Sequence, residues 1–326
     1  MSGVAGPVLE MLWETADPAR ALDVRFGFGD GESAARWVTA VLDAHWGVRV
    51  ASCARIVLSA HNALAWVGTS SGRMLAKWSV VPARFPRLAE TARLAYWLGG
   101  QGLPVSAPVP ALDGRLQVEA DGASMCLQRQ IDGDLLDTAD PDQVRAAGAT
   151  LARLQDALAG YPDADRIAAL SEPPAPLRQR ITGWLDGAEH VPAAVGDTLR
   201  RMVADAPPDR LPVQLVHRDF RAANVLCAGA DVVAVLDFEE TLLDHRIVEL
   251  ARSAVVLGTR FRHWGPVSAE VRARFLAGYR SVRELTAVEA GWWDAVRLWQ
   301  ALLAVPAGDD PTGWGRSALS QFAAEA

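Results

Sequence analysis

The residues best suited to chemistry lie between Gln214 and Glu240, in the segment QLVHRDFRAANVLCAGADVVAVLDFEE. A short apolar run leads into a polar loop that carries Asp219 and Asn224, and a later apolar run ends at Asp237. Strands on either side of a turn would return the chain so that the two carboxylates and the amide converge. Hard oxygen ligands of this kind hold Mg²⁺, and a separate carboxylate can orient an attacking hydroxyl. The segment therefore predicts Mg²⁺-assisted phosphoryl transfer.

The order and spacing of these residues resemble a known superfamily. HRDFRAAN at 217–224, followed by LDFE at 236–239, looks like the catalytic and metal loops of the protein-kinase-like superfamily. It is more closely similar to the aminoglycoside phosphotransferase and choline-kinase-type small-molecule kinases. The resemblance implies that Asp219 accepts or orients the substrate hydroxyl. It also implies that Asn224 and Asp237 hold Mg²⁺ against the phosphates of ATP, with GTP as an alternative nucleotide.

The same resemblance assigns supporting roles and exposes departures. Arg221 would stabilise charge on the transferring group, and His217 would have a scaffolding role. Arg218 departs from the pattern, because the small-molecule kinases usually carry Gly there. DFE replaces the DFG of protein kinases, and both Glu239 and Glu240 could face either substrate or solvent.

The short distance from the metal loop to the next helix favours a small acceptor over a protein. Only about ten residues separate Asp237 from the helix expected near Arg246, and no APE-like anchor follows. This leaves no room for the long activation segment of protein kinases. Asp244 and Arg246 are expected to brace the metal loop against that helix.

The single lysine of the chain provides an independent test. Of 32 basic residues, 31 are Arg and one is Lys77. A kinase of this type needs one Lys on the third strand, paired with a Glu on the following helix, to bind the α- and β-phosphates. Glu90 is the candidate partner. Apolar runs between turns predict three antiparallel strands and then a helix, over 54–58, 63–69, 73–81 and 84–99.

Further nucleotide contacts follow only from the resemblance. The loop from Ser59 to Ala63 would cover the phosphates, with Ser59 and Asn62 as candidate contacts, although it lacks the Gly-rich pattern of protein kinases. The segment 125–133 fits the hinge between the two lobes, and the backbone of its central residues would bind adenine; these are Gln128, Arg129 and Gln130. An ordinary strand that leads into a polar linker would have the same sequence.

The expected fold is α+β and bilobal, of the protein-kinase-like type. Residues 1–130 would form a nucleotide-binding lobe, an antiparallel sheet with one key helix, preceded by a helical extension over 1–50. Residues 131–326 would form a mostly helical lobe that carries the catalytic loop, the metal loop and the acceptor pocket. Further helices are expected over 33–46, 141–159, 177–188, 193–204 and most of 246–300, with strands near 115–119 and 124–129.

Composition limits the possible functions. With 326 residues, 50% hydrophobic and 22% charged, the chain is a globular protein and not a disordered one. The net charge of −7 argues against nucleic-acid binding. The three cysteines lack metal-ligand spacing and are expected to be reduced, and no apolar stretch is long enough to span a membrane, so we expect a cytoplasmic protein.

The acceptor is the least determined feature. Residues 1–130 carry a net charge of +1 and residues 131–326 carry −8, so the second lobe could attract a cationic molecule or simply be a solvated acidic surface. With the Ala- and Arg-rich composition, this favours an antibiotic, with Trp264, Trp292 and Trp293 near the acceptor pocket. The alternatives are a metabolic kinase for homoserine, choline or a sugar, and a catalytically inactive kinase-like binding protein.

One motif points elsewhere and is set aside. Gly68-Thr69-Ser70-Ser71-Gly72 matches the GxSxG pattern of serine hydrolases, in which a helix must follow the serine. Here a strand-like run follows, so Ser70 is expected in a hairpin turn.

Overall fold

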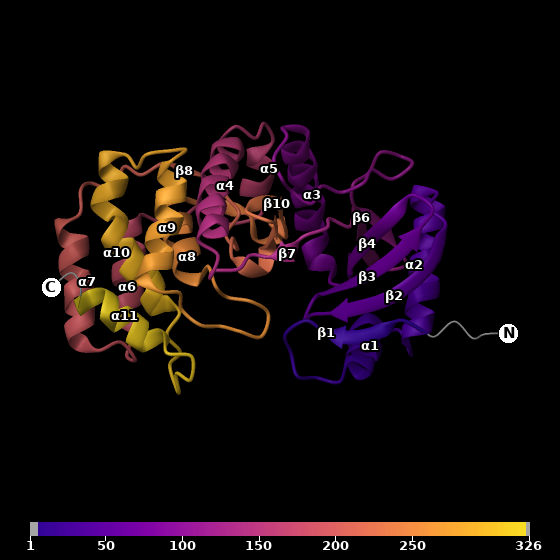
Figure 1. Cartoon of the computed structure of the whole chain (residues 1–326), viewed down its shortest axis with the longest axis horizontal. Coiled ribbons are helices and arrows are strands. Elements are labelled where there is room, and N and C mark those ends of the chain that lie inside the picture. The colour runs from indigo at the N-terminus through magenta and orange to yellow at the C-terminus, as the bar shows by residue number, and fades with distance from the viewer. Residues whose placement is uncertain (1–5, 324–326) are drawn as a thin grey trace. The chain divides into compact units, whose positions relative to one another are not determined.

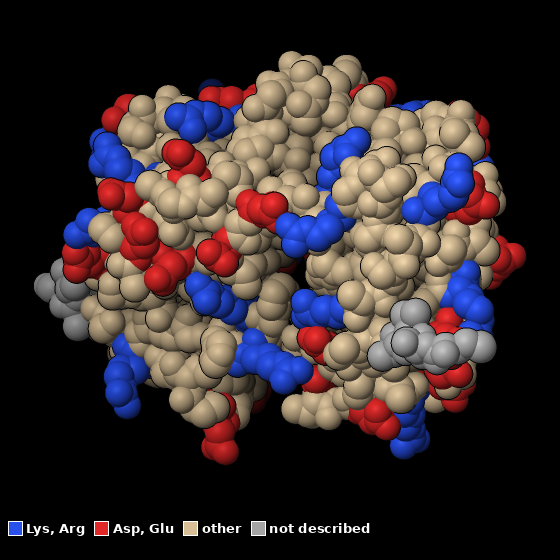
Figure 2. All heavy atoms as spheres, turned by 45° about the vertical axis from the view of Figure 1, so that its right-hand side comes forward, with Lys and Arg blue, Asp and Glu red and all other residues tan. Residues whose placement is uncertain are grey.

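The computed structural model describes residues 6–323 and divides the chain into two compact units, Met1–Asp132 and Gly133–Ala326 (Figure 1). Each unit has its own sheet and helices and is described by itself. Among the described residues, no helix combines the length and apolar character needed to cross a bilayer. Acidic and basic side chains are interspersed over the face that Figure 2 shows.

The first unit is built on a six-stranded sheet with the strand order β1-β2-β3-β4-β6-β5. β1 pairs parallel to β2, and the other neighbours pair antiparallel. The strands are β1 (Val8–Met11), β2 (Val50–Leu58), β3 (Asn62–Thr69), β4 (Gly72–Ser79), β5 (Val118–Ala120) and β6 (Ala123–Arg129). The helices are α1 (Pro18–Phe26), α2 (Gly31–Trp46), the 3-10 turn η1 (Pro82–Arg84) and α3 (Phe85–Gly100).

The core of this unit covers one face of the sheet. Alternate residues of β3 and β4, among them Ala65, Ala76 and Trp78, pack with apolar residues of α1 and α2. α2 is fixed in place by a capping box at Asp30 and by Gly47, which ends it in the left-handed conformation. α3 lies on the other side of the sheet from α2 (Figure 1).

The second unit combines small sheets with a bundle of helices. Two strand groups, β10-β9-β7 and β11-β8, support its loops. The strands are β7 (Asp134–Leu135), β8 (Val213–Val216), β9 (Val225–Ala228), β10 (Asp231–Val235) and β11 (Leu242–His245), with the 3-10 turns η2 (Ala222–Asn224) and η3 (Phe238–Glu240). The helices are α4 (Pro141–Ala159), α5 (Ala164–Ala168), α6 (Leu177–Gly187), α7 (Ala193–Asp205), α8 (Arg246–Val256), α9 (Ala269–Arg280), α10 (Ala287–Leu303) and α11 (Trp314–Ala323).

Two glycines set the distance between α4 and α9. A Cβ added at Gly148 would lie 2.0 Å from the carbonyl oxygen of Phe275, and one added at Gly278 would lie 2.0 Å from that of Arg145. Only a residue without a side chain fits at either place. The backbones of the two helices therefore approach closely, and this holds α9 against α4.

The α+β class, the antiparallel strands of the first unit and the helical second unit confirm the expected fold. The helical extension over 1–50 is wrong in one respect, because β1 is a strand within it. A strand of four residues is too short to show a clear periodicity. Residues 1–5 of that extension lie outside the described part of the chain.

Candidate active site

Three strands of the second unit position the catalytic loop. β8 delivers the chain into the loop at His217, and β9 and β10 form the hairpin that follows. The backbone N–H of Leu236 donates to the carbonyl of Asn224, at 2.9 Å. This bond places Asp237, the next residue, beside Asn224. Asp237 therefore follows directly on a residue that is hydrogen-bonded to Asn224, and a shared metal site of the two side chains stays a prediction.

The Asp219 carboxylate is held by two side chains of its own loop. Arg221 Nε donates to Oδ1 at 2.8 Å, and Asn224 Nδ2 donates to Oδ2 at 2.7 Å. Asn224 Nδ2 also donates to the Asp219 carbonyl, at 2.9 Å. The Asp219 side chain keeps 20% of its surface exposed, so an acceptor hydroxyl can reach it. A fixed and accessible carboxylate suits a group that receives or orients a proton.

His217 joins the catalytic loop to the metal strand. Its ring is completely buried and lies 4.7 Å from the Phe238 ring, centroid to centroid. Nδ1 accepts from the Asp219 backbone N–H at 3.2 Å, which leaves Nε2 to donate to the Leu236 carbonyl at 2.8 Å. Burial lowers the pKa of His217, although the nearby Asp219 carboxylate opposes the shift. His217 is therefore a neutral brace.

The chemistry of Asn224 and Asp237 fits a magnesium ion. Because Asn224 Nδ2 is committed to Asp219, its amide oxygen is the atom that remains to bind a cation. Asp237 adds a carboxylate, and it adopts a left-handed backbone (φ 60°) at the end of β10. An amide oxygen and a carboxylate are hard ligands of the type that Mg²⁺ prefers.

Arg221 lies between Asp219 and a tryptophan. The residue is 9% exposed, and its guanidinium carbon lies 5.5 Å from the centre of the Trp264 ring. Among the described residues, Nη1 of Arg221 has no hydrogen-bond partner and is buried. Trp264 is 54% exposed and belongs to the segment between α8 and α9, where Trp314 Nε1 donates to its carbonyl at 2.9 Å. A buried donor beside Asp219 suits charge on a transferring phosphoryl group.

The other candidates of the second unit differ in accessibility. Trp293 is partly buried, Glu239 is buried and Glu240 is exposed. Trp292 is completely buried, and its Nε1 donates to the Pro207 carbonyl at 3.1 Å. The expectation that Trp292 contacts the acceptor is therefore wrong, because the ring packs in the core.

Asp244 and Arg246 were expected to brace the metal loop against α8, but their ion pairs lie mainly elsewhere. The Asp244 carboxylate accepts two bonds from the Arg180 guanidinium, which attaches it to α6. Arg246 pairs with buried Glu289 on α10. Asp244 approaches the catalytic loop only at the Arg218 side chain, at 3.8 Å. Asp244 therefore mainly ties β11 to α6, and Arg246 ties α8 to α10.

Polar side chains of α8, which were not among the expected site residues, hold the loop that carries Asp219. Glu249 accepts from the backbone N–H of Arg218 at 2.7 Å, and Arg252 Nε donates to the Arg218 carbonyl at 3.0 Å. Burial lowers the pKa of Arg252, with Asp219 opposing the shift and the cations of Arg218 and Arg221 adding to it. Three charged residues at a spacing of three, Arg246, Glu249 and Arg252, interrupt an otherwise apolar helix. That pattern was the available signal.

In the first unit, Lys77 lies on a central strand. Its backbone pairs with Leu64 on β3 and Cys126 on β6, and it alternates with the core residues Ala76 and Trp78. Lys77 therefore points to the face opposite the core. Glu90 lies on α3, where its side chain is 17% exposed and pairs with Arg93.

The turn from Ser59 to Asn62 connects β2 and β3 by its own hydrogen bonds. Ser59 Oγ donates to the Asn62 carbonyl at 3.0 Å and accepts from the Asn62 N–H at 3.1 Å. Ser59 is buried, so its hydroxyl shapes the turn and does not reach a ligand, contrary to expectation. The exposed residues at the tip are Ala60 and His61.

The expected adenine-binding residues lie at the end of β6. Gln128 Nε2 donates to the Ser106 carbonyl at 3.0 Å, and the Arg129 side chain is exposed. The N–H of Gln130 donates to the Arg73 carbonyl at 3.0 Å, so it is not free to bind adenine. The hairpin between β3 and β4 contains Ser70, which confirms the turn expected there and leaves the hydrolase motif without its helix.

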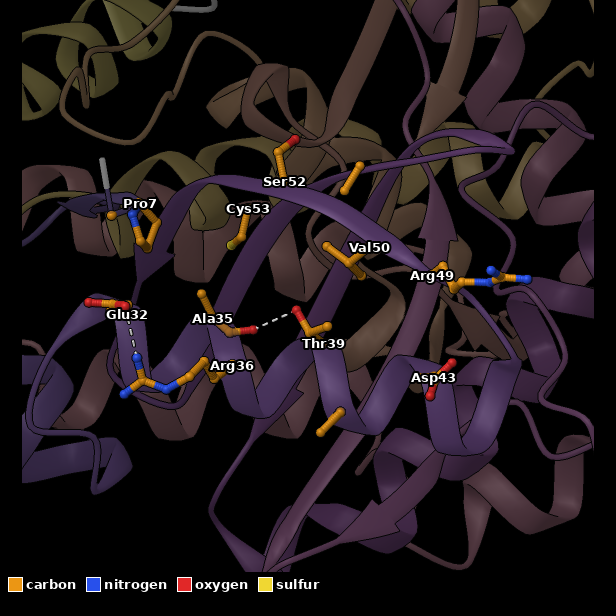
Figure 3. Close-up of a pocket in the computed structure, with 13 residues that line it drawn as sticks. Pro7, Glu32, Ala35, Arg36, Thr39, Asp43, Arg49, Val50, Ser52 and Cys53 are labelled. Carbon is orange, nitrogen blue, oxygen red and sulfur yellow. Dashed lines mark hydrogen bonds and ion pairs between the residues drawn. The ribbon is translucent and has the colours of Figure 1, made fainter. Parts of the chain in front are cut away.

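A hollow of about 640 Å³ lies elsewhere on the first unit, between α2 and β2 (Figure 3). Its charged side chains include Glu32 and Arg36, which pair with each other at 3.0 Å, and Cys53 lies on its β2 side. None of the candidate site residues lines it. We therefore do not assign the chemistry to this hollow.

The antiparallel strands of the first unit and the helices of the second have the α+β architecture of kinase-like folds. Residues 53–299 match the model of the phosphotransferase enzyme family, and the chain belongs to that family.

The individual relatives share only low sequence identity with this chain. A homoserine kinase of Methylobacillus flagellatus is 27% identical over 218 residues, which cover 63% of this chain and 65% of that protein. The macrolide 2'-phosphotransferase MphH from Brachybacterium faecium is similar in structure, with a TM-score of 0.59 and 16% identity over 89% of this chain and 94% of its own. The GDP and kanamycin complex of APH(2")-IIia has a TM-score of 0.57 and 14% identity over 89% and 98%. At these identities the solved structures show the fold alone.

Proposed function

We propose that this protein transfers the γ-phosphoryl group of ATP to a hydroxyl of a small molecule. The observation that carries the proposal is the Asp219 carboxylate, fixed by Arg221 and Asn224 and still exposed, with Asp237 beside Asn224. Kinases need this combination because the acceptor must be oriented while charge on the phosphates is neutralised.

Each residue of the loop has a distinct task. Asp219 orients the acceptor hydroxyl and takes its proton. Arg221 would place its positive charge near the transferring group, beside the Asp219 carboxylate that its Nε holds. Asn224 and Asp237 would hold Mg²⁺, which when bound neutralises charge on the phosphate oxygens.

The nucleotide is assigned to the first unit. Lys77 would bind the α- and β-phosphates, with Glu90 as its partner on α3. Backbone groups at Ala60 and His61, together with Asn62, would approach the phosphates, and the end of β6 would lie against the base, through Gln128 and Arg129. ATP is the proposed donor, and GTP is tested beside it because one structural relative binds GDP. The use of ATP supports a cytoplasmic location.

An antibiotic is the proposed acceptor class. The solved structures similar in fold include a macrolide phosphotransferase and a kanamycin complex. The net charge of −8 over residues 131–326 suits a cationic compound. The exposed ring of Trp264 beside Arg221 and the partly buried Trp293 offer surfaces for it, and Glu240 offers an exposed carboxylate.

Arginines near Asp219 favour a second acceptor class. The pKa of partly buried Arg252 responds to the charges of both Asp219 and Arg221, so these groups lie close together. A carboxylate on the acceptor would find positive charge there. The homoserine kinase relative is consistent with such a small amino acid alcohol. The inactive binding protein is disfavoured because Lys77, Asp219 and both metal-binding candidates are present.

The test is a turnover assay with purified protein, Mg²⁺ and either ATP or GTP. The acceptor panel combines macrolides and aminoglycosides with homoserine, choline and sugars, and mass spectrometry detects an added phosphate. We expect turnover of one class and loss of about 10²–10⁴-fold in Asp219→Ala. Asp294→Asn, at an exposed acid of α10, is the matched control. Undiminished turnover in Asp219→Ala would contradict the mechanism.

A further inference from the structure

The residue before the catalytic aspartate has an unusual backbone. Arg218 has a φ of 71°, in the left-handed region where a Cβ is unfavourable. Among the described residues only two others besides glycine have a positive φ, Asp121 and Asp237. This backbone conformation is unfavourable for any residue other than glycine. A non-glycine residue there must be held by its surroundings.

Helix α8 holds Arg218 from both sides of its backbone. Glu249 Oε1 accepts from the Arg218 N–H at 2.7 Å, and Arg252 Nε donates to the Arg218 carbonyl at 3.0 Å. The two helix residues are three positions apart, so they lie on the same side of α8. The position of Asp219, the next residue along the chain, depends on this pair of bonds.

Glu249 is in turn held by a buried series of side-chain hydrogen bonds. It is 2% exposed, and its Oε2 accepts from Gln155 Nε2 at 2.8 Å. Gln155 is completely buried, and its Oε1 accepts from the Tyr279 hydroxyl at 2.7 Å. Gln155 Nε2 also donates to the Arg246 carbonyl at 3.1 Å, which fixes the orientation of the amide. These hydrogen bonds run from Tyr279 on α9 through Gln155 on α4 and Glu249 on α8 to Arg218 in the loop.

Both groups that are hydrogen-bonded to the Glu249 carboxyl, the Arg218 N–H and the Gln155 amide, present a donor to it. A proton on Oε1 would face the N–H of Arg218, and a proton on Oε2 would face the amide N–H of Gln155. The carboxylate form alone satisfies both donors. We propose that Glu249 is a positioning residue that keeps Asp219 in its working place only while the Glu249 carboxyl is ionised. This inference rests on the proposed function.

The ionisation of Glu249 falls in an accessible pH range. Burial raises the pKa of Glu249 to about 7, against the lowering effect of the bonds from Gln155 and Arg218. The charge of Asp244 on β11 also raises the pKa of Glu249. The other charged and titratable groups around Glu249 are Arg246 and Arg252 on α8, His217 and Arg218 in the loop, and Tyr279 on α9. Turnover should therefore fall on the acid side of about pH 7.

The test compares the pH dependence of turnover in the wild type and Glu249→Gln. At pH 8.5 the variant should lose about 10-fold or more in kcat, with little change in KM for the nucleotide, because the loss concerns the position of Asp219. It should also lose the acid limb that the wild type shows near pH 7. Glu270→Gln, at an exposed acid of α9, is the matched control. An acid limb unchanged in Glu249→Gln would overturn the inference.

Two further measurements keep the result interpretable. Infrared difference spectra should show a carboxyl that protonates near pH 7 in the wild type and is missing in Glu249→Gln, without any substrate. If that band is present but no acceptor is phosphorylated at any pH, the proposed function fails and the titration of Glu249 stands. If Glu249→Gln does not fold, Tyr279→Phe replaces it as the test. This variant keeps the Glu249 carboxyl but removes the hydrogen bond from Tyr279 to Gln155, so it should shift the acid limb. An unshifted limb would count against the inference.

Discussion

Replacing Glu289 by glutamine tests a buried ion pair of the second unit. Glu289 on α10 and Arg246 on α8 are 1% and 6% exposed, and the pair is bidentate. Glu289 also caps α10, because it accepts from the backbone N–H and the hydroxyl of Thr286, both at 2.9 Å. Glutamine keeps an oxygen for Thr286 but leaves the Arg246 charge buried without its partner.

The magnitude follows from this arrangement. Removing one partner of a buried pair costs about 3–5 kcal/mol, whereas losing a helix cap costs about 1 kcal/mol. In urea titrations, Glu289→Gln should therefore lower the free energy of unfolding by about 3 kcal/mol or more, and Thr286→Ala by about 1 kcal/mol. Glu284→Gln, at an exposed acid, is the control. The reasoning is refuted if Glu289→Gln costs no more than Thr286→Ala.

The pH dependence supplies a second check on the same pair. Burial by itself would raise the pKa of Glu289, but the bonds from Arg246 and Thr286 lower it below its ordinary value. A carboxyl whose pKa is lower in the folded state stabilises the fold above its unfolded pKa of about 4.3 and loses that effect as pH falls. The difference in stability between the wild type and Glu289→Gln should therefore shrink below about pH 4. A difference that stays constant down to pH 3 would contradict this assignment.

Three other predictions concern separate parts of the chain. Lys77→Arg should fold normally but lose about 100-fold in kcat/KM, because a guanidinium does not replace a compact ammonium at a phosphate. Wild-type turnover in this variant would mean that Lys77 does not bind the nucleotide phosphates. Gly278→Ala should lower the free energy of unfolding by about 3 kcal/mol, since its Cβ would meet the Arg145 carbonyl at 2.0 Å, and a loss below about 1 kcal/mol would mean that α9 shifts freely. Burial raises the pKa of the Cys227 thiol to about 11, so a thiol reagent at pH 8 should label partly exposed Cys53 first in the native protein, and equal rates would disagree with the structure.

The catalytic loop was predictable because its parts are close in sequence. Asp219, Asn224 and Asp237 lie on one strand–loop–hairpin segment, so the spacing of residue types nearly determines their arrangement. Lys77 was predictable for a related reason, since short apolar runs placed it on the third strand of the expected sheet. The resemblance to a kinase superfamily then supplied roles that spacing alone does not give.

Burial was not predictable in the same way. Trp264 and Trp292 are the same residue type in neighbouring parts of the second unit, yet one is 54% exposed and the other is completely buried. Ser59 looked like a ligand contact, but its hydroxyl closes the turn that contains it. Which polar or aromatic group faces solvent depends on the elements packed around it.

The sequence by itself determined the class of the protein, the loop that carries Asp219 and Asn224, and the strand position of Lys77. Local periodicity and short spacings carry that information, because strands, turns and helices form from neighbouring residues. Only the tertiary structure decided how the catalytic loop is held. Glu249 and Gln155 are 94 positions apart, and Gln155 and Tyr279 are 124 apart, yet they form one hydrogen-bonded chain. Contacts between such distant residues arise when helices pack, and no local pattern in the sequence records them.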